Sequence, residues 1–384
     1  MKLRHAPAPA PSGVAAARDI IVRPAALARV WTARDEPYET MAVPGVVLAP
    51  GDVLVAVELA TTCAADLRAA TGGLAVPAPF VPGHEGVGRI VALGEGGARA
   101  ATGRDVLLGD RVVWGTAFAC GSCSGCLRGA EGSDALAGCR SIHHYGRERI
   151  GGHWELVGTV ATHVHLRAGT ALVAVGERMP ARVAAPAACA ASTAWAALRT
   201  AEDDVDLDGA VVLVTGAGLR GLSATAMAAD RGARVIVSEP DDRRRARARR
   251  FGAAAVVDPC DEGAIARAAR AVGGTGVRVA VETSGAGAAV ETVLAVVEAG
   301  GAVVLTGDDT TVPIAAGAPI RDRIRVSRVP RGTGTDLVDA IAYLRAACGA
   351  RPFEDLVEPV LSLADADALR HGADAVRIGI DPRR

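Results

Sequence analysis

The stretch AVVLVTGAGLRGLSATAMAADR, residues 210–231, decides the fold. Its first six residues are an apolar run typical of a buried strand, and Leu219–Arg231 is predicted to be a helix. Gly216, Gly218 and Gly221 form a G-x-G-x-x-G turn between them. In such a turn the first glycine permits the bend, the second lets backbone approach a pyrophosphate, and the third lets the helix pack on the strand. The helix N-terminus adds N–H groups that attract phosphate.

An acidic residue follows this turn at the spacing of a ribose ligand. Glu239 ends the second predicted strand, 21 residues after Gly218, where a carboxylate can accept hydrogen bonds from ribose hydroxyls. A carboxylate repels a 2′-phosphate, so we expect NAD rather than NADP. The arginines at 243–245 follow Glu239 closely and leave NADP as an alternative. The competing interpretation of these arginines is that they are only the solvated face of a helix. The competing interpretation is an ordinary glycine turn beside a solvated Glu239.

The residues around this stretch alternate between strand and helix patterns, which indicates a parallel sheet covered on both faces. The further predicted strands are Arg234–Ser238, Ala254–Val257, Val277–Glu282 and Gly301–Leu305, and the predicted helices are Asp241–Phe251, Glu262–Val272 and Ala286–Val297. Up to about residue 190 the chain instead alternates short β-like runs, such as Val53–Val57 and Arg111–Trp114, with Gly- and Pro-rich turns. A helix is expected again at Asp336–Cys348.

Composition excludes several functional classes. The 384 residues are 50% hydrophobic and 22% charged with a net charge of -1, so the chain has material for two or three folded domains. Near-zero charge and only 3% aromatic residues argue against nucleic-acid binding. No apolar run suits a membrane helix or a signal peptide, so we expect no membrane partner and a cytoplasmic location. Residues 1–28, rich in Ala and Pro, are predicted to be a loose extension.

Four of the eight cysteines crowd one segment. Cys120, Cys123 and Cys126 have the spacing C-x-x-C-x-x-C, and Cys139 would complete a tetrahedral all-sulfur zinc site of the closed, structural kind. Asp134 is a rival fourth ligand, although thiolate suits zinc better in such a site. The two cysteines expected to be bystanders are Cys260 and Cys348.

Other candidates are uninformative when taken alone. His84 lies in Gly83-His84-Glu85, with Cys63 placed 21 residues upstream. A single histidine or cysteine is more often a satisfied core residue than a ligand. The histidines expected to be solvent-facing or core residues are His143, His144, His163 and His165.

Joined in order, these motifs resemble a known family. Cys63, the G-H-E-x-x-G of residues 83–88, the G-D-R-V of residues 109–112, the cysteine segment and the glycine turn are similar to the zinc-dependent medium-chain alcohol dehydrogenases. The likeness runs from about Val30 to the C-terminus. It implies an α/β protein that forms a homodimer or homotetramer. The implied divisions are a GroES-like, mostly-β catalytic domain at 29–190, a Rossmann dinucleotide-binding domain at 191–328 and a returning C-terminal segment at 329–384, after the extension at 1–28.

The resemblance also implies roles. Cys63, His84 and Cys189 would hold a catalytic zinc, Glu85 would exchange with its bound water, and Asp66 would orient His84. The four clustered cysteines would hold a structural zinc. The implied reaction is hydride transfer between NAD(P) and a small alcohol or carbonyl compound, with zinc as Lewis acid. The implied cofactor-binding residues are Thr193, Gly216, Gly218, Leu219, Arg220, Gly221, Glu239, Arg244, Thr306 and Arg377.

Two segments further resemble a subgroup associated with phosphonate metabolism. They are residues 144–154, which begin His144-Tyr145-Gly146-Arg147-Glu148, and residues 185–189. We name no substrate from this likeness.

The chain departs from the family pattern at four points. Ala65 replaces a Ser or Thr that relays the alcohol proton, Arg68 replaces a histidine of that relay, and Arg220 replaces an apolar residue behind the nicotinamide. The cysteine segment is also about five residues longer, which a surface loop tolerates. Losing a positioned acid–base group typically costs ~100- to 10,000-fold in rate.

These departures leave three alternatives open. Water or another side chain relays the proton in an alcohol dehydrogenase with an atypical relay. In the second alternative, the enzyme reduces a conjugated C=C or C=N bond, and Arg68 grips an anionic group such as a carboxylate or phosphonate. In the third, the chain is a non-redox or inactive dinucleotide-binding protein.

Overall fold

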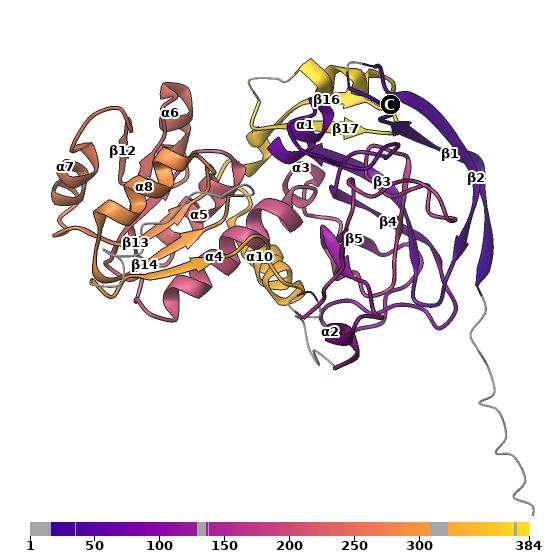
Figure 1. Cartoon of the computed structure of the whole chain (residues 1–384), viewed down its shortest axis with the longest axis horizontal. Coiled ribbons are helices and arrows are strands. Elements are labelled where there is room, and N and C mark those ends of the chain that lie inside the picture. The colour runs from indigo at the N-terminus through magenta and orange to yellow at the C-terminus, as the bar shows by residue number, and fades with distance from the viewer. Residues whose placement is uncertain (1–16, 35, 129–135, 137, 308–321, 372–374) are drawn as a thin grey trace, which may run out of the picture.

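The computed structural model describes residues 17–34, 36–128, 136, 138–307, 322–371 and 375–384. It has two lobes, one built around a parallel sheet and one rich in antiparallel strands (Figure 1). The predicted fold class, a GroES-like β domain combined with a Rossmann domain, is confirmed. Within the described ranges, no helix is both long enough and apolar enough to cross a membrane.

A six-stranded parallel sheet forms the first lobe, in the order β12-β11-β10-β13-β14-β15. The strand order runs outward in both directions from the β10–β13 pair, so the loops after these two strands diverge. In such sheets ligands bind at this switch point, beyond the carboxyl ends of the strands. The strands are β10 (Val211–Thr215), β11 (Arg234–Ser238), β12 (Ala255–Val257), β13 (Val277–Glu282), β14 (Val297–Leu305) and β15 (Arg325–Arg328).

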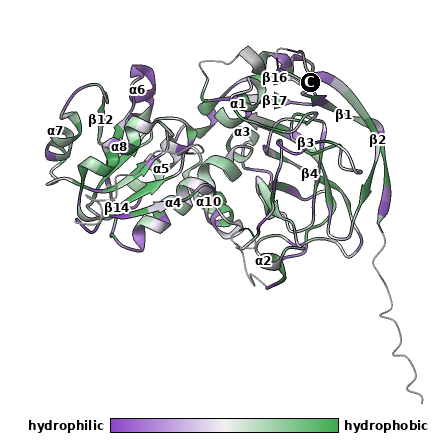
Figure 2. Ribbon diagram, in the orientation of Figure 1, coloured by the Kyte–Doolittle hydropathy of each residue, from purple (hydrophilic) through white to green (hydrophobic). Residues whose placement is uncertain are grey.

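Helices cover both faces of this sheet because successive strand residues point to opposite sides. Val212 and Val214 pack with α4, α5 and α10, whereas Val211 and Leu213 pack with α7 and α8. Hydrophobic strands fill the middle of the lobe, and the arginine-rich α6 lies at its outside (Figure 2). The helices are α4 (Ser192–Glu202), α5 (Leu219–Ala229), α6 (Asp242–Arg250), α7 (Ala264–Ala271), α8 (Gly287–Val296) and α10 (Gly334–Ala347).

The second lobe contains a seven-stranded sheet that both ends of the chain build. Its path is β16-β17-β3-β4-β5-β9, with β8 also paired to β3. The last strands of the chain therefore lie against β3, as the yellow arrows beside the purple strands show (Figure 1). The strands are β3 (Val53–Thr62), β4 (Glu85–Leu93), β5 (Arg111–Trp114), β8 (His163–Leu166), β9 (Leu172–Ala174), β16 (Val357–Ser362) and β17 (Arg377–Asp381).

Short elements complete the fold and carry several site residues. The short helices are α1 (Ala64–Ala70), α2 (Ser124–Leu127), α3 (Ala181–Ala184), the π-helical turn η1 (Ala187–Ala191), and the 3₁₀ turns η2 (Phe353–Leu356) and η3 (Ala364–His371). A small two-stranded sheet pairs β6 (Ala117–Ala119) with β7 (Ile142–His144).

The prediction that residues 1–28 form a loose extension is wrong for residues 18–28. They belong to β1 (Arg18–Val30), which pairs antiparallel with β2 (Glu39–Leu48) around a bulge between Ile21 and Ala26. Ala and Pro are depleted in strands, so the composition of residues 1–28 did not indicate this strand. In the structure Ala26, Ala28 and Val30 are buried, whereas Leu27 between them is exposed, as expected for a strand with one buried face. Residues 1–16 lie outside the described ranges.

A buried carboxylate joins the start of β3 to β8. Asp52 accepts hydrogen bonds from the N–H groups of Ala49 at 3.0 Å and Ala168 at 2.9 Å. It also lies 2.8 Å from His165 Nε2 and 3.2 Å from Arg167 Nη1. Burial by itself raises the pKa of Asp52, but these hydrogen bonds and the charges of His165 and Arg167 lower it overall. The ionised carboxylate therefore stabilises this corner of the sheet.

We expect Asp52→Asn to lower the free energy of unfolding by about 3 kcal/mol at pH 7, because an amide NH₂ would face groups that all donate. The folded-state pKa lies below the unfolded value of about 3.9, so the stabilisation is present above that pH and lost as pH falls below it. Urea denaturation should thus show a deficit that shrinks below about pH 4. The exposed control Asp105→Asn should change stability by less than about 0.5 kcal/mol. Equal losses in both variants would contradict the assignment.

Candidate active site

Strand register brings Cys63 and His84 together. Thr61 of β3 lies directly opposite Glu85 of β4 in an antiparallel pair. Cys63 is just beyond the last residue of β3, and His84 is just before the first residue of β4, so both side chains leave the sheet at the same end. Cys63 Sγ lies 3.5 Å from His84 Nε2, and both residues are buried.

Cys189 joins this pair from a segment far along the chain, directly before α4, which packs on the parallel sheet. It lies in η1, the π-helical turn before α4, a distortion often found at functional sites. The ligand atoms of Cys63, His84, Glu85 and Cys189 all lie within 4.8 Å of one another. Around a tetrahedral zinc, a sulfur and a nitrogen ligand lie roughly 3.5 Å apart, which matches the Cys63–His84 separation. The donor set therefore fits zinc.

Asp66 positions two members of this group. Its Oδ2 accepts the Cys63 N–H at 2.8 Å, and Cys63 caps the first turn of α1. Its Oδ1 lies 3.1 Å from His84 Nδ1. A carboxylate on Nδ1 directs Nε2 of the same ring toward a metal. The hydrogen bonds from His84 and Cys63 and the charge of His84 outweigh burial and lower the pKa of Asp66 to about 2.

A buried ion pair between Glu85 and Arg377 lies beside the metal-binding group. Glu85 is fully buried and accepts the Thr61 hydroxyl at 2.6 Å. Arg377, the first residue of β17, donates to both Glu85 oxygens at 3.2 and 3.3 Å. The resemblance predicted that Arg377 reaches the cofactor's pyrophosphate. In the structure its guanidinium is engaged with Glu85.

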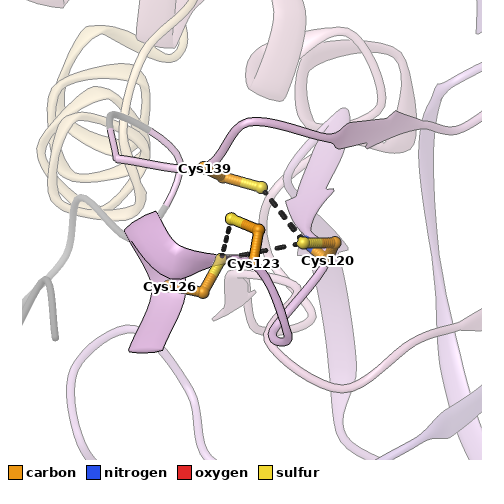
Figure 3. A group of neighbouring side chains, drawn as sticks. All are labelled: Cys120, Cys123, Cys126 and Cys139. Atoms are coloured by element: carbon orange, nitrogen blue, oxygen red, sulfur yellow. Dashed lines mark hydrogen bonds between the residues drawn. The ribbon is translucent and has the colours of Figure 1, made fainter. Parts of the chain in front are cut away.

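The four clustered cysteines form a second group (Figure 3). Their sulfur atoms lie 3.5 Å apart for Cys123–Cys126, 3.6 Å for Cys120–Cys139 and 3.9 Å for Cys120–Cys126. Sulfur ligands of a tetrahedral zinc lie about 3.8 Å apart, so this set also fits. The N–H groups of Arg140 and Cys126 lower the pKa of Cys123 to about 6, which favours the thiolate. The rival ligand Asp134 lies outside the described residues.

The glycine turn has the shape that a dinucleotide needs. Gly216 has φ of +90°, and a Cβ on Gly221 would lie 2.0 Å from the Gly216 carbonyl oxygen, so helix and strand pack in contact there. A Cβ on Gly218 would meet nothing within 4 Å. Gly218 is also the N-cap of α5 and offers no capping side chain. Open space beside uncapped N–H groups is suited to a pyrophosphate.

Glu239 lies at the edge of this turn. It accepts the Ala217 N–H at 2.7 Å and the Asp241 N–H at 3.1 Å, and it is buried. Arg245 donates to the backbone carbonyls of Glu239 and Pro240, and the N–H of Arg244 donates to Asp241. The Arg245 guanidinium is thus turned to the backbone, and the choice between NAD and NADP stays a prediction.

The remaining predicted cofactor residues lie on α4, on α5 and just after β14. Thr193 donates its hydroxyl to the Cys189 carbonyl at 2.7 Å, and Thr306 donates its hydroxyl to the Glu282 carbonyl. Arg220 donates to the Thr306 carbonyl and reaches within 4.0 Å of Cys189 Sγ. Leu219 is buried at the start of α5.

A cavity of about 260 Å³ opens onto the buried ligands. It is lined by both lobes, with His84, Cys189, Thr193 and Arg220 among the lining residues. The others are Thr116, His144, Tyr145, Arg147, Arg328, Pro330 and Arg331. Arg68, expected to grip an anionic substrate in the second alternative, is in the last turn of α1 and is not among the described residues that line the cavity.

Sequence reasoning missed part of this cavity. His144 was expected to be a solvent-facing or core residue, but it lines the cavity, and Arg328 and Arg331 attracted no attention. The sequence feature that could have indicated the role of His144 and Arg147 is the segment of residues 144–154, whose likeness to a subgroup is described above. The other histidines lie elsewhere: His165 pairs with Asp52, while His143 lies near Glu148 and His163 near Thr162.

Comparison with known proteins finds a matching family model for each of the two lobes. Residues 221–346 match the family model of a zinc-binding dehydrogenase, and residues 49–177 match that of an alcohol dehydrogenase GroES-like domain. An alcohol dehydrogenase of Geobacillus stearothermophilus is 30% identical over 297 residues, covering 76% of this chain and 81% of the relative.

Two crystal structures share the fold. An alcohol dehydrogenase from Thermotoga maritima matches with a TM-score of 0.79 and 24% identity, covering 93% of this chain and 99% of the other. A Sinorhizobium meliloti protein described as a zinc-binding dehydrogenase, with NADP bound, matches with a TM-score of 0.76 and 23% identity over the same shares.

Removing the Arg377 charge should destabilise the zinc-loaded protein. We expect Arg377→Met to lower the free energy of unfolding by about 3–5 kcal/mol, because the buried Glu85 carboxylate loses its cation. Adding Glu85→Gln to that variant should restore part of the loss. Urea denaturation of the two single variants and the double variant measures the coupling. Strictly additive losses would contradict the ion pair's role.

The cysteine group yields a second prediction. Cys139→Ser should lower the zinc content by one ion per chain, whereas Asp134→Ala should leave it unchanged, because thiolate is the better ligand in an all-sulfur site. Metal analysis of the purified variants by inductively coupled plasma mass spectrometry decides between them. Loss of zinc from Asp134→Ala alone would make Asp134 the fourth ligand.

Proposed function

The chain belongs to the zinc-dependent medium-chain alcohol dehydrogenase family and is an NAD(P)-dependent oxidoreductase, and from that premise we propose that it interconverts a small alcohol and its aldehyde or ketone through an atypical proton relay. Cys63, His84 and Cys189 would hold the catalytic zinc, with Glu85 as an exchangeable neighbour. Cys120, Cys123, Cys126 and Cys139 would hold the structural zinc.

One observation carries this proposal. The same cavity is lined by His84 and Cys189 of the metal-binding group, by Thr193, which donates to the Cys189 carbonyl, and by Arg220 of the glycine turn. A substrate in the cavity would therefore contact the metal and the reactive end of the dinucleotide together. Alcohol dehydrogenation requires that proximity, because the hydride must pass directly between cofactor and substrate carbon.

The residues around the cavity have separate roles in the proposed reaction. When bound, zinc polarises the substrate oxygen and the dinucleotide carries the hydride. Asp66 holds His84 in the orientation that directs Nε2 toward Cys63 and the metal-binding group. Arg377 balances the charge of the Glu85 carboxylate, which is buried beside the proposed zinc ligands. The G-x-G-x-x-G turn positions the dinucleotide through backbone N–H groups.

The proton needs a different carrier from the usual hydroxyl. Ala65 is buried and has no proton to move. The Tyr145 hydroxyl is occupied by Thr170 and the Arg167 N–H. The Thr193 hydroxyl donates to the Cys189 carbonyl. Apart from the proposed zinc ligands, Thr116 and His144 are the other uncharged side chains with a polar hydrogen among the described residues that line the cavity. Burial, and then the charges of Arg331 and Arg147, lower the pKa of His144 to about 4. The imidazole is therefore neutral at pH 7, and it can pass a proton on by accepting one at one ring nitrogen while releasing one from the other, without holding a positive charge. We assign the relay to His144 in this role, with Thr116 beside it.

Reduction of a conjugated C=C or C=N bond is the second candidate, and Ala65 is the observation that favours it. In that reaction no alkoxide proton has to be relayed at the position where Ala65 lies. The two functions give different products from one probe.

His144→Gln should lower kcat for alcohol oxidation ~100-fold or more, because glutamine cannot take up a proton. Zinc content should stay the same. The exposed His153→Asn is the matched control, since asparagine tolerates the positive φ at that position. Adding Ala65→Ser to the His144→Gln variant should recover at least ~10-fold by supplying a hydroxyl relay. A wild-type rate in His144→Gln would remove His144 from the mechanism.

But-2-enal with NADH or NADPH separates the two functions. The proposed dehydrogenase should produce but-2-en-1-ol, with the double bond intact, as identified by gas chromatography of the products. Butanal as the only product would replace the proposal with conjugate reduction.

A further inference from the structure

We propose that Arg220 is a positioning residue that couples the dinucleotide site to the metal site, because it reaches the Cys189 sulfur from the first turn of α5. This inference rests on the proposed function, in which Cys189 is a ligand of the catalytic zinc. Arg220 is one of the four departures from the family pattern, and the roles assigned above leave it without one.

The Arg220 guanidinium bridges two segments of the chain. Its Nη1 donates to the backbone carbonyl of Thr306, which directly follows β14, and its Nη2 lies 4.0 Å from Cys189 Sγ. A cysteine that binds zinc does so as the thiolate. A hydrogen bond from a guanidinium to a thiolate is charge-assisted and therefore stronger than one between neutral groups. The metal-loaded protein should thus hold this contact firmly.

Both acceptors are themselves held in place. Thr306 donates its N–H at 2.9 Å and its hydroxyl at 2.8 Å to the carbonyl of Glu282. The Cys189 carbonyl accepts the hydroxyl of Thr193 at 2.7 Å. Because these hydrogen bonds anchor both segments, a guanidinium that spans them restrains the Cys189 sulfur relative to the end of β14.

The backbone of Arg220 belongs to the glycine turn. Arg220 is the second residue of α5, two residues after the N-cap Gly218. Gly221, the next residue, packs so closely that a Cβ on it would lie 2.0 Å from the Gly216 carbonyl oxygen. A pyrophosphate bound to the N–H groups of this turn would restrain the first turn of α5, and the Arg220 side chain with it. Dinucleotide binding should therefore steady the Cys189 ligand and strengthen the retention of zinc.

The two cysteines of the metal-binding group face different kinds of N–H donor. Cys63 Sγ accepts the backbone N–H of Ala65 at 3.3 Å, a contact that the first turn of α1 imposes. Cys189 Sγ instead faces the charged side chain of Arg220. A donor beside a metal-bound sulfur withdraws charge from it and so tunes the metal. The Arg220 contact can be removed by substitution of a side chain, so its effect can be measured.

Metal retention tests the contact without turnover. Native mass spectrometry during titration with EDTA should show two zinc ions leaving the wild type, one of which is absent from Cys189→Ser and so belongs to the metal-binding group. In Arg220→Met this ion should leave at a ~10- to 100-fold lower EDTA concentration. Arg220→Lys, which keeps an N–H donor, should restore part of the difference. Unchanged retention in Arg220→Met would overturn the proposal.

Two controls locate the effect. The ion of the four clustered cysteines is the internal control, and every Arg220 variant should retain it as the wild type does. Arg267→Met is the matched arginine control, because Arg267 lies on α7, pairs with Asp261 and is 55% exposed. Loss of both ions from Arg220→Met would mean that this variant does not fold. Arg220→Gln, whose amide is too short to reach Cys189, then takes its place in the same measurements.

The coupling to the dinucleotide gives the second test. The reduced dinucleotide, NADH or NADPH, should raise the EDTA concentration that removes the ion of the metal-binding group by ~5-fold or more. By linkage, that ion should strengthen dinucleotide binding by the same factor. In Arg220→Met both effects should disappear. An equal effect in that variant would overturn the coupling, because the dinucleotide would then act on the metal by another route.

Cobalt gives a readout that a purely structural role would not move. With cobalt in place of zinc, the thiolate-to-metal charge-transfer band should lie at longer wavelength in Arg220→Met than in the wild type, because the sulfur loses a hydrogen-bond donor. Arg267→Met should match the wild type. A band at the wild-type position in Arg220→Met would contradict the hydrogen bond to Cys189.

These outcomes separate the two claims. A wild type that binds one zinc would count against the proposed function, and with it the role of Arg220. Two ions that Arg220→Met retains as firmly as the wild type would leave the function standing and overturn this inference alone.

Discussion

The register between β3 and β4 is the constraint on which the site depends. Because Thr61 faces Glu85, the residues just outside the two strands, Cys63 and His84, must meet at one end of the sheet. A slip of one residue would turn each of these side chains to the opposite face. The last strand of the chain secures the arrangement, since β17 pairs with β3 and brings Arg377 to the buried Glu85.

The parallel sheet imposes a second, independent constraint. Its switch point places the glycine turn at the carboxyl edge, and the ends of β14 and β15 lie along the same edge. β14 ends at Leu305, directly before Thr306, and β15 ends at Arg328, three residues before Arg331. In the proposed function, substrate, cofactor and metal would therefore be brought together by the two lobes, both of which line the cavity.

Local patterns predicted much of the fold and one of the two metal-binding groups. The glycine turn, the alternation of strand and helix around it and the C-x-x-C-x-x-C spacing each depend on neighbours in sequence, so periodicity and spacing reveal them. Cys63, His84 and Cys189 could be joined only through a family resemblance, because long-range register sets their proximity. Strand β1 escaped because Ala and Pro conceal its alternation. Arg328 and Arg331 were missed because no local pattern tells which arginines line a cavity.

Native mass spectrometry of the purified chain, without added metal, tests the central claim most directly. The account predicts two zinc ions per chain in the wild type and one in Cys189→Ser, which removes a ligand of the proposed catalytic centre but leaves the cysteine group intact. A single zinc in both proteins would contradict it, because the group around Cys63 and His84 would then hold no metal in the enzyme as purified.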